Sequence, residues 1–234
     1  MTTLARTGAE SASMAAEPST AVQDYAKAIY VLGEGRKAVS TSAISERLAV
    51  SPPSASAMLK RLESLGLVVR RPYHGVTLTG AGRRVALEVI RHHRLLELYL
   101  AEALGMPWDR VHAEAEVLEH AISPELSERI SQALGNPTHD PHGDPIPTPE
   151  GRIEHSKTRP LAELKPGQTG VFVRVSDQDP AMLRYLSERG ILPGDRFEVL
   201  ATEPFEGPIS VRFAERVHSL GGALARAMRT EEAG

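Results

Sequence analysis

The chain contains no cysteine among its 234 residues, and only 4% of them are aromatic. Without cysteine there are no disulfides, thiolate metal sites or cysteine nucleophiles, so any metal ion must be bound by oxygen and imidazole groups. No apolar run approaches the roughly 20 residues that span a bilayer, and the N-terminus lacks the apolar segment of a signal peptide. We therefore expect a cytoplasmic protein with no membrane contact.

Positive charge is concentrated in one part of the chain. The length is large for one domain and suits two small ones, and 41% of the residues are hydrophobic. The net charge is −3, yet residues 21–80 carry eight Lys or Arg against four Asp or Glu, a balance of +4 that leaves −7 for the remainder. This segment is therefore the candidate for a nucleic-acid partner.

The first 80 residues have the pattern of a winged helix-turn-helix. Residues 1–19 are rich in Ala, Ser, Thr and Glu and are expected to form a disordered tail. Periodic apolar residues, serine caps and an alternating ribbon define the elements that follow. These are helices at about 20–33, 41–48 and 52–65 and a two-stranded ribbon at 68–78. We assign residues 20–80 to a DNA-binding domain of this type.

The last of these three helices would be the recognition helix, which enters the major groove by its N-terminus. Side chains of its first turns would face base edges, and cations on the helix and the wing would reach phosphates. The first set is Ser51, Pro53, Ser54 and Ala57, and the second is Lys60, Arg61, Arg70 and Arg71. The alternatives are a winged helix used for protein contacts and a small core unit without a partner; the positive balance argues against both.

The sequence VHAEAEVLEH, residues 111–120, brings four potential metal ligands together. On a helix, His112, Glu116, Glu119 and His120 stand at i, i+4, i+7 and i+8, within an arc of roughly 100°. Like charges at this proximity raise one another's free energy unless a cation or proton intervenes. A divalent metal ion is the simplest explanation, and a solvated amphipathic helix is the alternative.

A long helix at about 80–104 adds two further candidates. His93 lies on its apolar stripe, and Glu97 is one turn later on the same face, so the two can bind one metal ion together with a ligand from another helix. His92 points about 100° away and is expected to be solvated. With a further helix that ends at Gly135, residues 81–135 form the predicted helical domain for metal binding and dimerisation.

The rest of the chain reads as a linker and a small β domain. Residues 136–160 are rich in Pro, Gly, His and Asp, and we expect a solvated interdomain loop. Its His139, His142 and His155 could bind metal, but the proline-rich sequence favours solvated side chains. Residues 161–230 contain short strands, Pro-Gly turns and a helix at about 180–189, the pattern of an SH3-like small barrel. Its acidic SDQD loop could offer Asp177 and Asp179 to a neighbouring site.

These features together resemble one known family. A winged helix, HRLLE on a long helix, VHAEAEVLEH, the DPHGDPIP segment and a C-terminal SH3-like domain are similar to the diphtheria toxin repressor family over about residues 20–230. The resemblance implies a mainly α fold with small β elements and a FeoA-type barrel. It also implies a homodimer that binds a palindromic operator when loaded with Mn(II) or Fe(II), and that represses metal-uptake genes.

The resemblance further implies two metal sites per chain. The ligands carried over are Asp24, Glu116, Glu119 and His120 for the primary site, and His93, Glu97 and His112 with Asp177 and Asp179 for the second. The iron-responsive branch has Met and Cys in place of Asp24 and Glu116, so the resemblance favours manganese, and hard carboxylate oxygens suit Mn(II). Short manganese regulators carry Glu in place of Lys27, so their closely paired metal site is not expected here.

The expected switch is electrostatic. Asp24, Glu116 and Glu119 should repel one another when no cation is present, which leaves the first helix loosely held until a divalent ion ties it to the dimerisation core. Two rivals remain at this point: a metalloenzyme built on His and Glu pairs, and a winged-helix regulator that needs no metal. A requirement for divalent metal in DNA binding would separate the prediction from both rivals.

Overall fold

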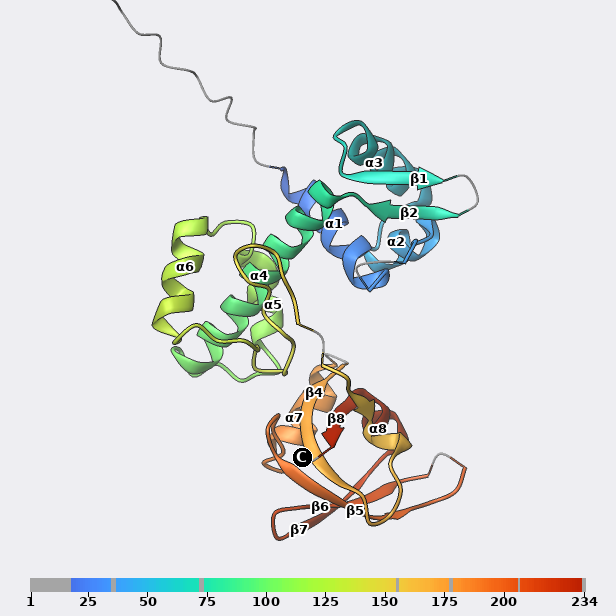
Figure 1. The fold of residues 1–234 in the computed structure, drawn as a ribbon, viewed down its shortest axis with the longest axis vertical. Coiled ribbons are helices and arrows are strands. Elements are labelled where there is room, and N and C mark those ends of the chain that lie inside the picture. The colour runs from blue at the N-terminus through green and yellow to red at the C-terminus, as the bar shows by residue number, and fades with distance from the viewer. Residues whose placement is uncertain are drawn as a thin grey trace, which may run out of the picture.

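The computed structural model describes residues 18–34, 37–71, 74–154, 156–176, 179–205 and 207–232. Three parts follow one another in space as in the chain, with a helical part between a winged part and a C-terminal barrel (Figure 1). The predicted fold class, mainly α with small β elements, is confirmed. The predicted tail lies outside the described residues except for its last two.

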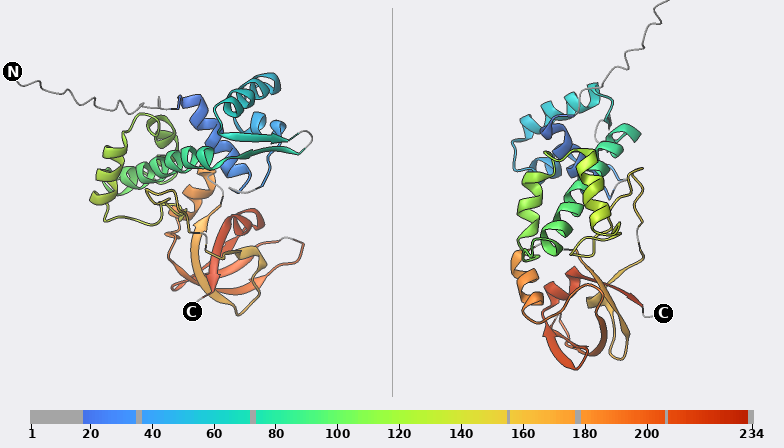
Figure 2. Two further views of the ribbon diagram at one scale, coloured as in Figure 1. Left: turned by 45° about the horizontal axis from the view of Figure 1, so that its top comes forward. Right: turned by 90° about the vertical axis from the view of Figure 1, so that its left-hand side faces the viewer.

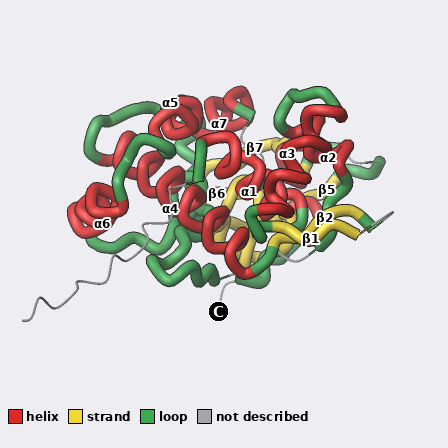
Figure 3. The backbone as a smooth tube through the Cα atoms, turned by 90° about the horizontal axis from the view of Figure 1, so that it is seen from above, coloured by secondary structure: helices red, strands yellow, loops and turns green. Residues whose placement is uncertain are grey.

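The winged part contains the predicted helices and ribbon. Ser40 and Ser51 accept hydrogen bonds from the backbone N–H groups of Ala43 and Ser54, at 3.1 and 3.3 Å, and so start the second and third helices. The β1–β2 ribbon lies beside α3 (Figure 3), and Val68 pairs with Leu78 across it. The elements are α1 (Thr20–Leu32), α2 (Thr41–Arg47), α3 (Pro52–Ser64), β1 (Val68–Arg71) and β2 (Gly75–Leu78).

The helical part is organised around α4 (Gly80–Glu102), with α5 (Val111–Leu118) and α6 (Pro124–Ala133) against it. Ala26 and Tyr30 of α1 pack on Ala86 and Ile90 of α4 in one buried cluster. A side chain at Gly82 would place its Cβ 2.0 Å from the Leu67 carbonyl oxygen, so glycine permits this close approach of α4 to the wing. The start of α4 is thereby fixed to the DNA-binding part.

Residues 136–154 of the proline-rich segment are packed along α4 instead of forming an open loop, and His155 lies outside the described residues. Ile146 is buried with Leu95 and Leu96. The carbonyl groups of Pro145 and Pro147 accept hydrogen bonds from Arg94 and Arg91. Residues 136–154 form no helix or sheet that would pair these carbonyl groups, so the arginines provide the hydrogen-bond donors that they need.

The C-terminal barrel contains a six-stranded sheet with the order β3-β8-β4-β5-β6-β7. Phe172, Leu183, Val199 and Val211 fill its core. The last helix and strand were not predicted, because GALARA is short and MRTEE shows little alternation. The elements are β3 (Arg159–Pro160), a 3-10 turn (Leu161–Glu163), β4 (Thr169–Val175), α7 (Pro180–Ser187), β5 (Arg196–Thr202), β6 (Ile209–Phe213), β7 (Arg216–Leu220), α8 (Gly222–Ala227) and β8 (Met228–Glu232).

In the right-hand view of Figure 2, the helical part lies between the winged part above and the barrel below. Within the described ranges, no helix combines the length and the apolar character that crossing a bilayer requires.

Candidate metal centre

Among the described residues, nine His, Asp and Glu side chains form four overlapping groups that run from α1 through α4 and α5 to the loop of Asp140 and His142. In each group, the potential ligand atoms lie within 4.8 Å of one another. Neighbouring groups share one residue: Glu119, then His93, then Glu97. The groups are Asp24–Glu119–His120, His93–Glu116–Glu119, His93–Glu97–His112 and Glu97–Asp140–His142.

The first group, the Asp24 group, joins α1 to the end of α5. His120 Nε2 lies 2.9 Å from Asp24 Oδ1 and 3.4 Å from Glu119 Oε1. His120 Nδ1 lies 2.6 Å from Gln23 Oε1, which can only accept, so Nδ1 donates and Nε2 faces the two carboxylates. Burial raises the pKa of Asp24, and the positive charge of His120 opposes that rise. Sequence reasoning did not identify Gln23, which orients this imidazole.

The second group, His93–Glu116–Glu119, lies around the ammonium group of Lys27, and this positive charge changes the expected electrostatics. Lys27 Nζ lies 2.8 Å from Glu116 Oε1 and 2.8 and 2.9 Å from the two oxygens of Glu119. His93 Nδ1 is 3.3 Å from the same nitrogen. Burial acts to raise the pKa of Glu116, but the hydrogen bond and charge of Lys27 outweigh it and lower the pKa. The expectation that Asp24, Glu116 and Glu119 face one another uncompensated is therefore wrong.

The third group confirms the predicted pairing of His93 with Glu97. His93 Nε2 and His112 Nδ1 lie 2.9 and 3.0 Å from Glu97 Oε1, and 3.0 Å from each other. Burial favours neutral forms, but the hydrogen bonds with Glu119 and Glu97 raise the pKa of His93. Interactions with His112, His142 and His93 hold the pKa of Glu97 well below its usual value. His92, expected in solvent, is 8% exposed, and its Nδ1 donates to the Glu119 carbonyl oxygen at 3.3 Å.

The fourth group corrects a second expectation. His142, predicted in a solvated loop, is fully buried, and its Nδ1 lies 3.7 Å from Glu97 Oε2. Among the described residues, these two atoms and Asp140 Oδ2 are buried without a hydrogen-bond partner. Burial and the charges of Asp144 and Glu97 raise the pKa of Asp140 to about 8. Burial opposes ionisation of His142, but Glu97 raises its pKa to about 9.

These atoms without hydrogen bonds fit a divalent cation, and Arg94 Nε, 3.7 Å from Asp140 Oδ2, is the cation that already lies beside them. Unsatisfied buried polar atoms are costly and rare in folded proteins, and here three of them converge in one group. Each is a carboxylate oxygen or an imidazole nitrogen, which suit Mn(II), Fe(II) and Zn(II). Asp140 was missed, and His142 was assigned to solvent, because both lie in a loop, where helical spacing gives no guidance. Their signal was the Asp-x-His pattern of DPHGDPIP.

His142 also connects the metal centre to the barrel. Its Nε2 donates to the Trp108 carbonyl oxygen at 2.8 Å, so in the neutral ring Nδ1 carries the lone pair that faces Glu97. The Val175 N–H of β4 donates to the His142 carbonyl oxygen at 3.0 Å. Gly143 has φ of +85°, and a Cβ there would lie 1.9 Å from the Val173 carbonyl oxygen. The loop thus lies directly against β4.

The SDQD loop does not join these groups in the part of the chain that is described. Asp177 lies outside the described residues. The Asp179 side chain accepts a hydrogen bond from the Ala181 N–H at 2.8 Å and caps α7. Asp179 belongs to none of the four groups found among the described residues, so its assignment as a ligand gains no support from this structure.

The predicted DNA-contact residues lie on the solvent face of the winged part. Ala55, Leu59 and Leu62 bury the opposite face of α3. Arg70 is partly exposed, with Glu63 at 3.9 Å. The exposed members are Ser51, Pro53, Ser54, Ala57, Lys60, Arg61 and Arg71.

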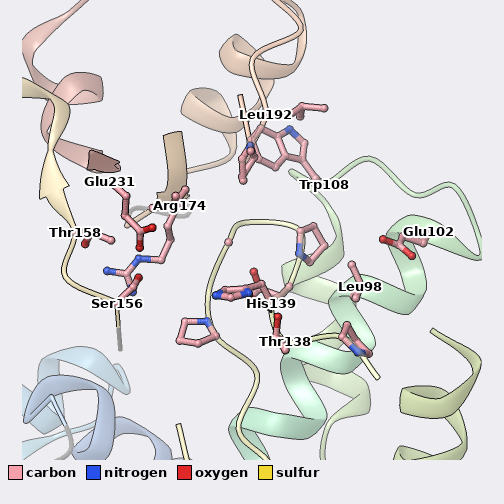
Figure 4. Close-up of a pocket in the computed structure, with 18 of the residues that line it drawn as sticks. Leu98, Glu102, Trp108, Thr138, His139, Ser156, Thr158, Arg174, Leu192 and Glu231 are labelled. Carbon is pink, nitrogen blue, oxygen red and sulfur yellow. Dashed lines mark hydrogen bonds between the residues drawn. The ribbon is translucent and has the colours of Figure 1, made fainter. Parts of the chain in front are cut away.

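A cavity of about 860 Å³ lies between the helical part and the barrel, next to the metal centre (Figure 4). Leu98, His139 and Trp108 line one wall, and Arg174 and Glu231 face them from the barrel. The interface between the two parts is therefore open at this cavity and closed where the His142 loop contacts β4.

Comparisons with known proteins identify the family. Residues 17–76 match the N-terminal DNA-binding domain of iron-dependent repressors, 79–148 their metal-binding and dimerisation domain, and 159–232 the FeoA domain. The iron-dependent repressor IdeR of Mycobacterium leprae is 33% identical over 221 residues, which cover 89% of this chain and 95% of the relative. The chain belongs to the iron-dependent repressor family, which includes the diphtheria toxin repressors.

Solved structures agree with this membership, but the two described here name manganese, whereas the IdeR relative names iron. A manganese-dependent transcriptional repressor in complex with manganese is 44% identical, with a TM-score of 0.82, and the match covers 91% of this chain and all of that one. The manganese regulator SloR is 30% identical, with a TM-score of 0.70, and the match covers 91% and 98%. The family consists of transcriptional repressors, so the prediction of a metal-dependent repressor is confirmed.

Proposed function

We propose that this repressor is activated by Mn(II), binds a palindromic operator as a homodimer in the cytoplasm, and controls genes of metal-ion uptake. The observation that carries the proposal is the Asp24 group, because it joins a helix of the DNA-binding part to α5 through oxygen and nitrogen donors alone. Hard oxygen donors suit Mn(II), whereas thiolate and thioether sulfur suit softer ions. Fe(II), named for the IdeR relatives, is the alternative metal.

The proposed primary site comprises Asp24, Glu119 and His120, with Glu116 next to them. When bound, a divalent ion supplies positive charge between these carboxylates. Asp24 lies on α1, whose buried residues Ile29 and Val22 share a core with Ala55 and Leu59 of α3. The position of α1 against α5 therefore sets where the recognition helix lies relative to the dimer partner.

The proposed second site comprises Glu97, Asp140 and His142, with His93 and His112 on the other oxygen of Glu97. The unpartnered atoms of the first three residues support this choice. A cation there would hold the 136–160 segment on α4 beside β4, and so favour the docked position of the barrel.

Exposed apolar residues of the helical part support the homodimer. Val117 of α5 and Leu126 of α6 are 73% and 46% exposed. Both lie in residues 79–148, which match the metal-binding and dimerisation domain of iron-dependent repressors. Contact with the same surface of a second copy of the chain would cover these side chains and bury apolar area.

The test is a gel-shift titration of the operator with Mn(II), Fe(II), Zn(II) and a chelator under anaerobic conditions. We expect no specific complex with chelator and full activation by Mn(II). Because Fe(II) and Zn(II) bind most nitrogen and oxygen sites more tightly than Mn(II), a preference for Mn(II) should show as a smaller advantage of Fe(II) and Zn(II) in half-activation concentration than this intrinsic order predicts. DNA binding that is unaffected by chelator would overturn the proposed function.

The wing supplies a second test. Replacing both Arg70 and Arg71 with Ala should weaken binding to all sequences about equally and reduce the slope of log K against log salt by about one to two units, because lost phosphate contacts release fewer counterions. Arg129→Ala, on an exposed arginine paired with Glu125 in α6, is the matched control. An unchanged slope in the double variant would count against the ribbon as a DNA contact.

The second site makes a separate prediction. His142→Gln should weaken binding of one of two Mn(II) ions per chain by at least the roughly 10- to 100-fold that loss of an outer hydrogen-bond partner causes, while leaving the primary site intact. Isothermal titration with Mn(II) would measure both ions, and His139→Gln, on an exposed neighbour in the same loop, is the control. Two unchanged binding events in the His142 variant would remove His142 from the ligand set.

A further inference from the structure

Lys27 stands among groups that otherwise suit a metal ion. Its Nζ lies within 2.9 Å of three carboxylate oxygens of Glu116 and Glu119 and 3.3 Å from an imidazole nitrogen of His93. Those three residues are themselves one of the groups that could hold a metal. An ammonium group donates three hydrogen bonds and carries one positive charge, so it can take the place of a cation for these carboxylates.

The same lysine connects the two helices that a metal ion would connect. Lys27 is on α1, and Glu116 and Glu119 lie on and directly after α5. The side chain of Lys27 is 15% exposed and that of Glu119 is 1% exposed, so their ion pair is well shielded from solvent. The pair holds α1 against α5 without any metal ion.

We propose that Lys27 is a built-in competitor of the activating cation. Its ammonium satisfies Glu116 and Glu119 in the metal-free chain, and a divalent ion at the Asp24 group must take Glu119 from it. This competition raises the metal concentration at which the repressor switches on. The proposal rests on the proposed function, because it concerns the affinity of the primary site.

The charges indicate the direction of the effect. Asp24, Glu116 and Glu119 carry three negative charges within the first two groups, and Lys27 offsets one of them. A positive charge a few ångströms from a divalent ion opposes its binding unless the side chain moves away. A lysine has a flexible stem, and Glu116 is 47% exposed, so Lys27 has a route towards solvent.

The test is Lys27→Met, which keeps the length of the apolar stem and removes the charge. We expect two opposite changes: a lower unfolding temperature in chelator, and Mn(II) binding that is at least about tenfold tighter at the primary site. Free Mn(II) can be measured by electron paramagnetic resonance, without DNA. If the role of Lys27 were purely structural, its removal would lower the unfolding temperature and also weaken Mn(II) binding.

Two further variants complete the experiment. Lys27→Arg keeps the positive charge and should remain within about threefold of the wild-type Mn(II) affinity, whereas Lys37→Met removes an exposed lysine paired with Glu34 and should change neither quantity. Unchanged or weaker Mn(II) binding by a folded Lys27→Met would overturn the proposal. Failure of the proposed function is distinguishable, because it would show as wild-type DNA binding that needs no metal.

Discussion

Glu119→Gln is expected to abolish Mn(II)-dependent operator binding while leaving a folded dimer. Glu119 is buried and belongs both to the Asp24 group and to the group around Lys27. The amide keeps the shape of the carboxylate but loses its charge and one acceptor oxygen. Loss of a residue that only hydrogen-bonds to a metal ligand already lowers metal affinity by about 10- to 100-fold. Glu119 is itself a proposed ligand, so its loss should weaken Mn(II) binding by more than about 100-fold.

The measurements are the free Mn(II) concentration at half-saturation and the gel shift at saturating Mn(II). Glu114→Gln, on the exposed face of α5, is the matched control and should behave as wild type. His120→Ala removes a second ligand of the Asp24 group and should give the same loss. Circular dichroism and light scattering would verify fold and dimer. Metal-dependent operator binding at wild-type strength by the Glu119 variant would refute the assignment of the primary site.

Trp108→Ala is expected to detach the barrel from the helical part. Trp108 comes from the loop between α4 and α5, yet its side chain is buried in the hydrophobic core of the barrel, and its Nε1 donates to the Leu183 carbonyl oxygen at 3.1 Å. Truncating a buried tryptophan costs about 3–5 kcal/mol. Because the cost falls on the contact between two parts, it should loosen their docking more than it unfolds either one.

Two observations would detect this detachment. Limited proteolysis should cleave the variant within residues 146–160 faster than wild type, and calorimetry should show a separate barrel transition. Trp108→Phe keeps most of the packing and loses one hydrogen bond, which contributes about 1 kcal/mol, so it should remain docked. Gly143→Ala, which would place a Cβ against the Val173 carbonyl oxygen, should loosen the same contact independently. A single transition and unchanged proteolysis in both alanine variants would contradict this account of docking.

The sequence predicted what depends on local periodicity. His93 and Glu97 are four residues apart on one helix, and the structure brings them to 2.9 Å. The winged helix followed in the same way from caps, apolar stripes and a short ribbon. The helical projection was less accurate at the end of α5, because the helix stops at Leu118, and Glu119 and His120 reach Asp24 from the turn that follows.

Contacts between distant segments could not be predicted in this way. His142 lies 45 positions after Glu97 in a proline-rich segment, and its burial depends on Trp108 and β4, which no local pattern relates to it. Lys27 was noted as a departure from the short manganese regulators, but its hydrogen bonds to Glu116 and Glu119 span about 90 residues. Such pairs depend on tertiary packing, which overrides local propensity.

Shared side chains have a consequence for mutational studies of this repressor. The four groups contain twelve ligand positions but only nine residues, because Glu119, His93 and Glu97 each serve two groups. A substitution at any of these three therefore damages two neighbouring groups at once, and its effect should not equal the sum of separate losses. The terminal members, such as Asp24 and His142, act on one group each. A survey that ranks residues by single substitutions will thus place the three shared residues first, whichever group governs DNA binding.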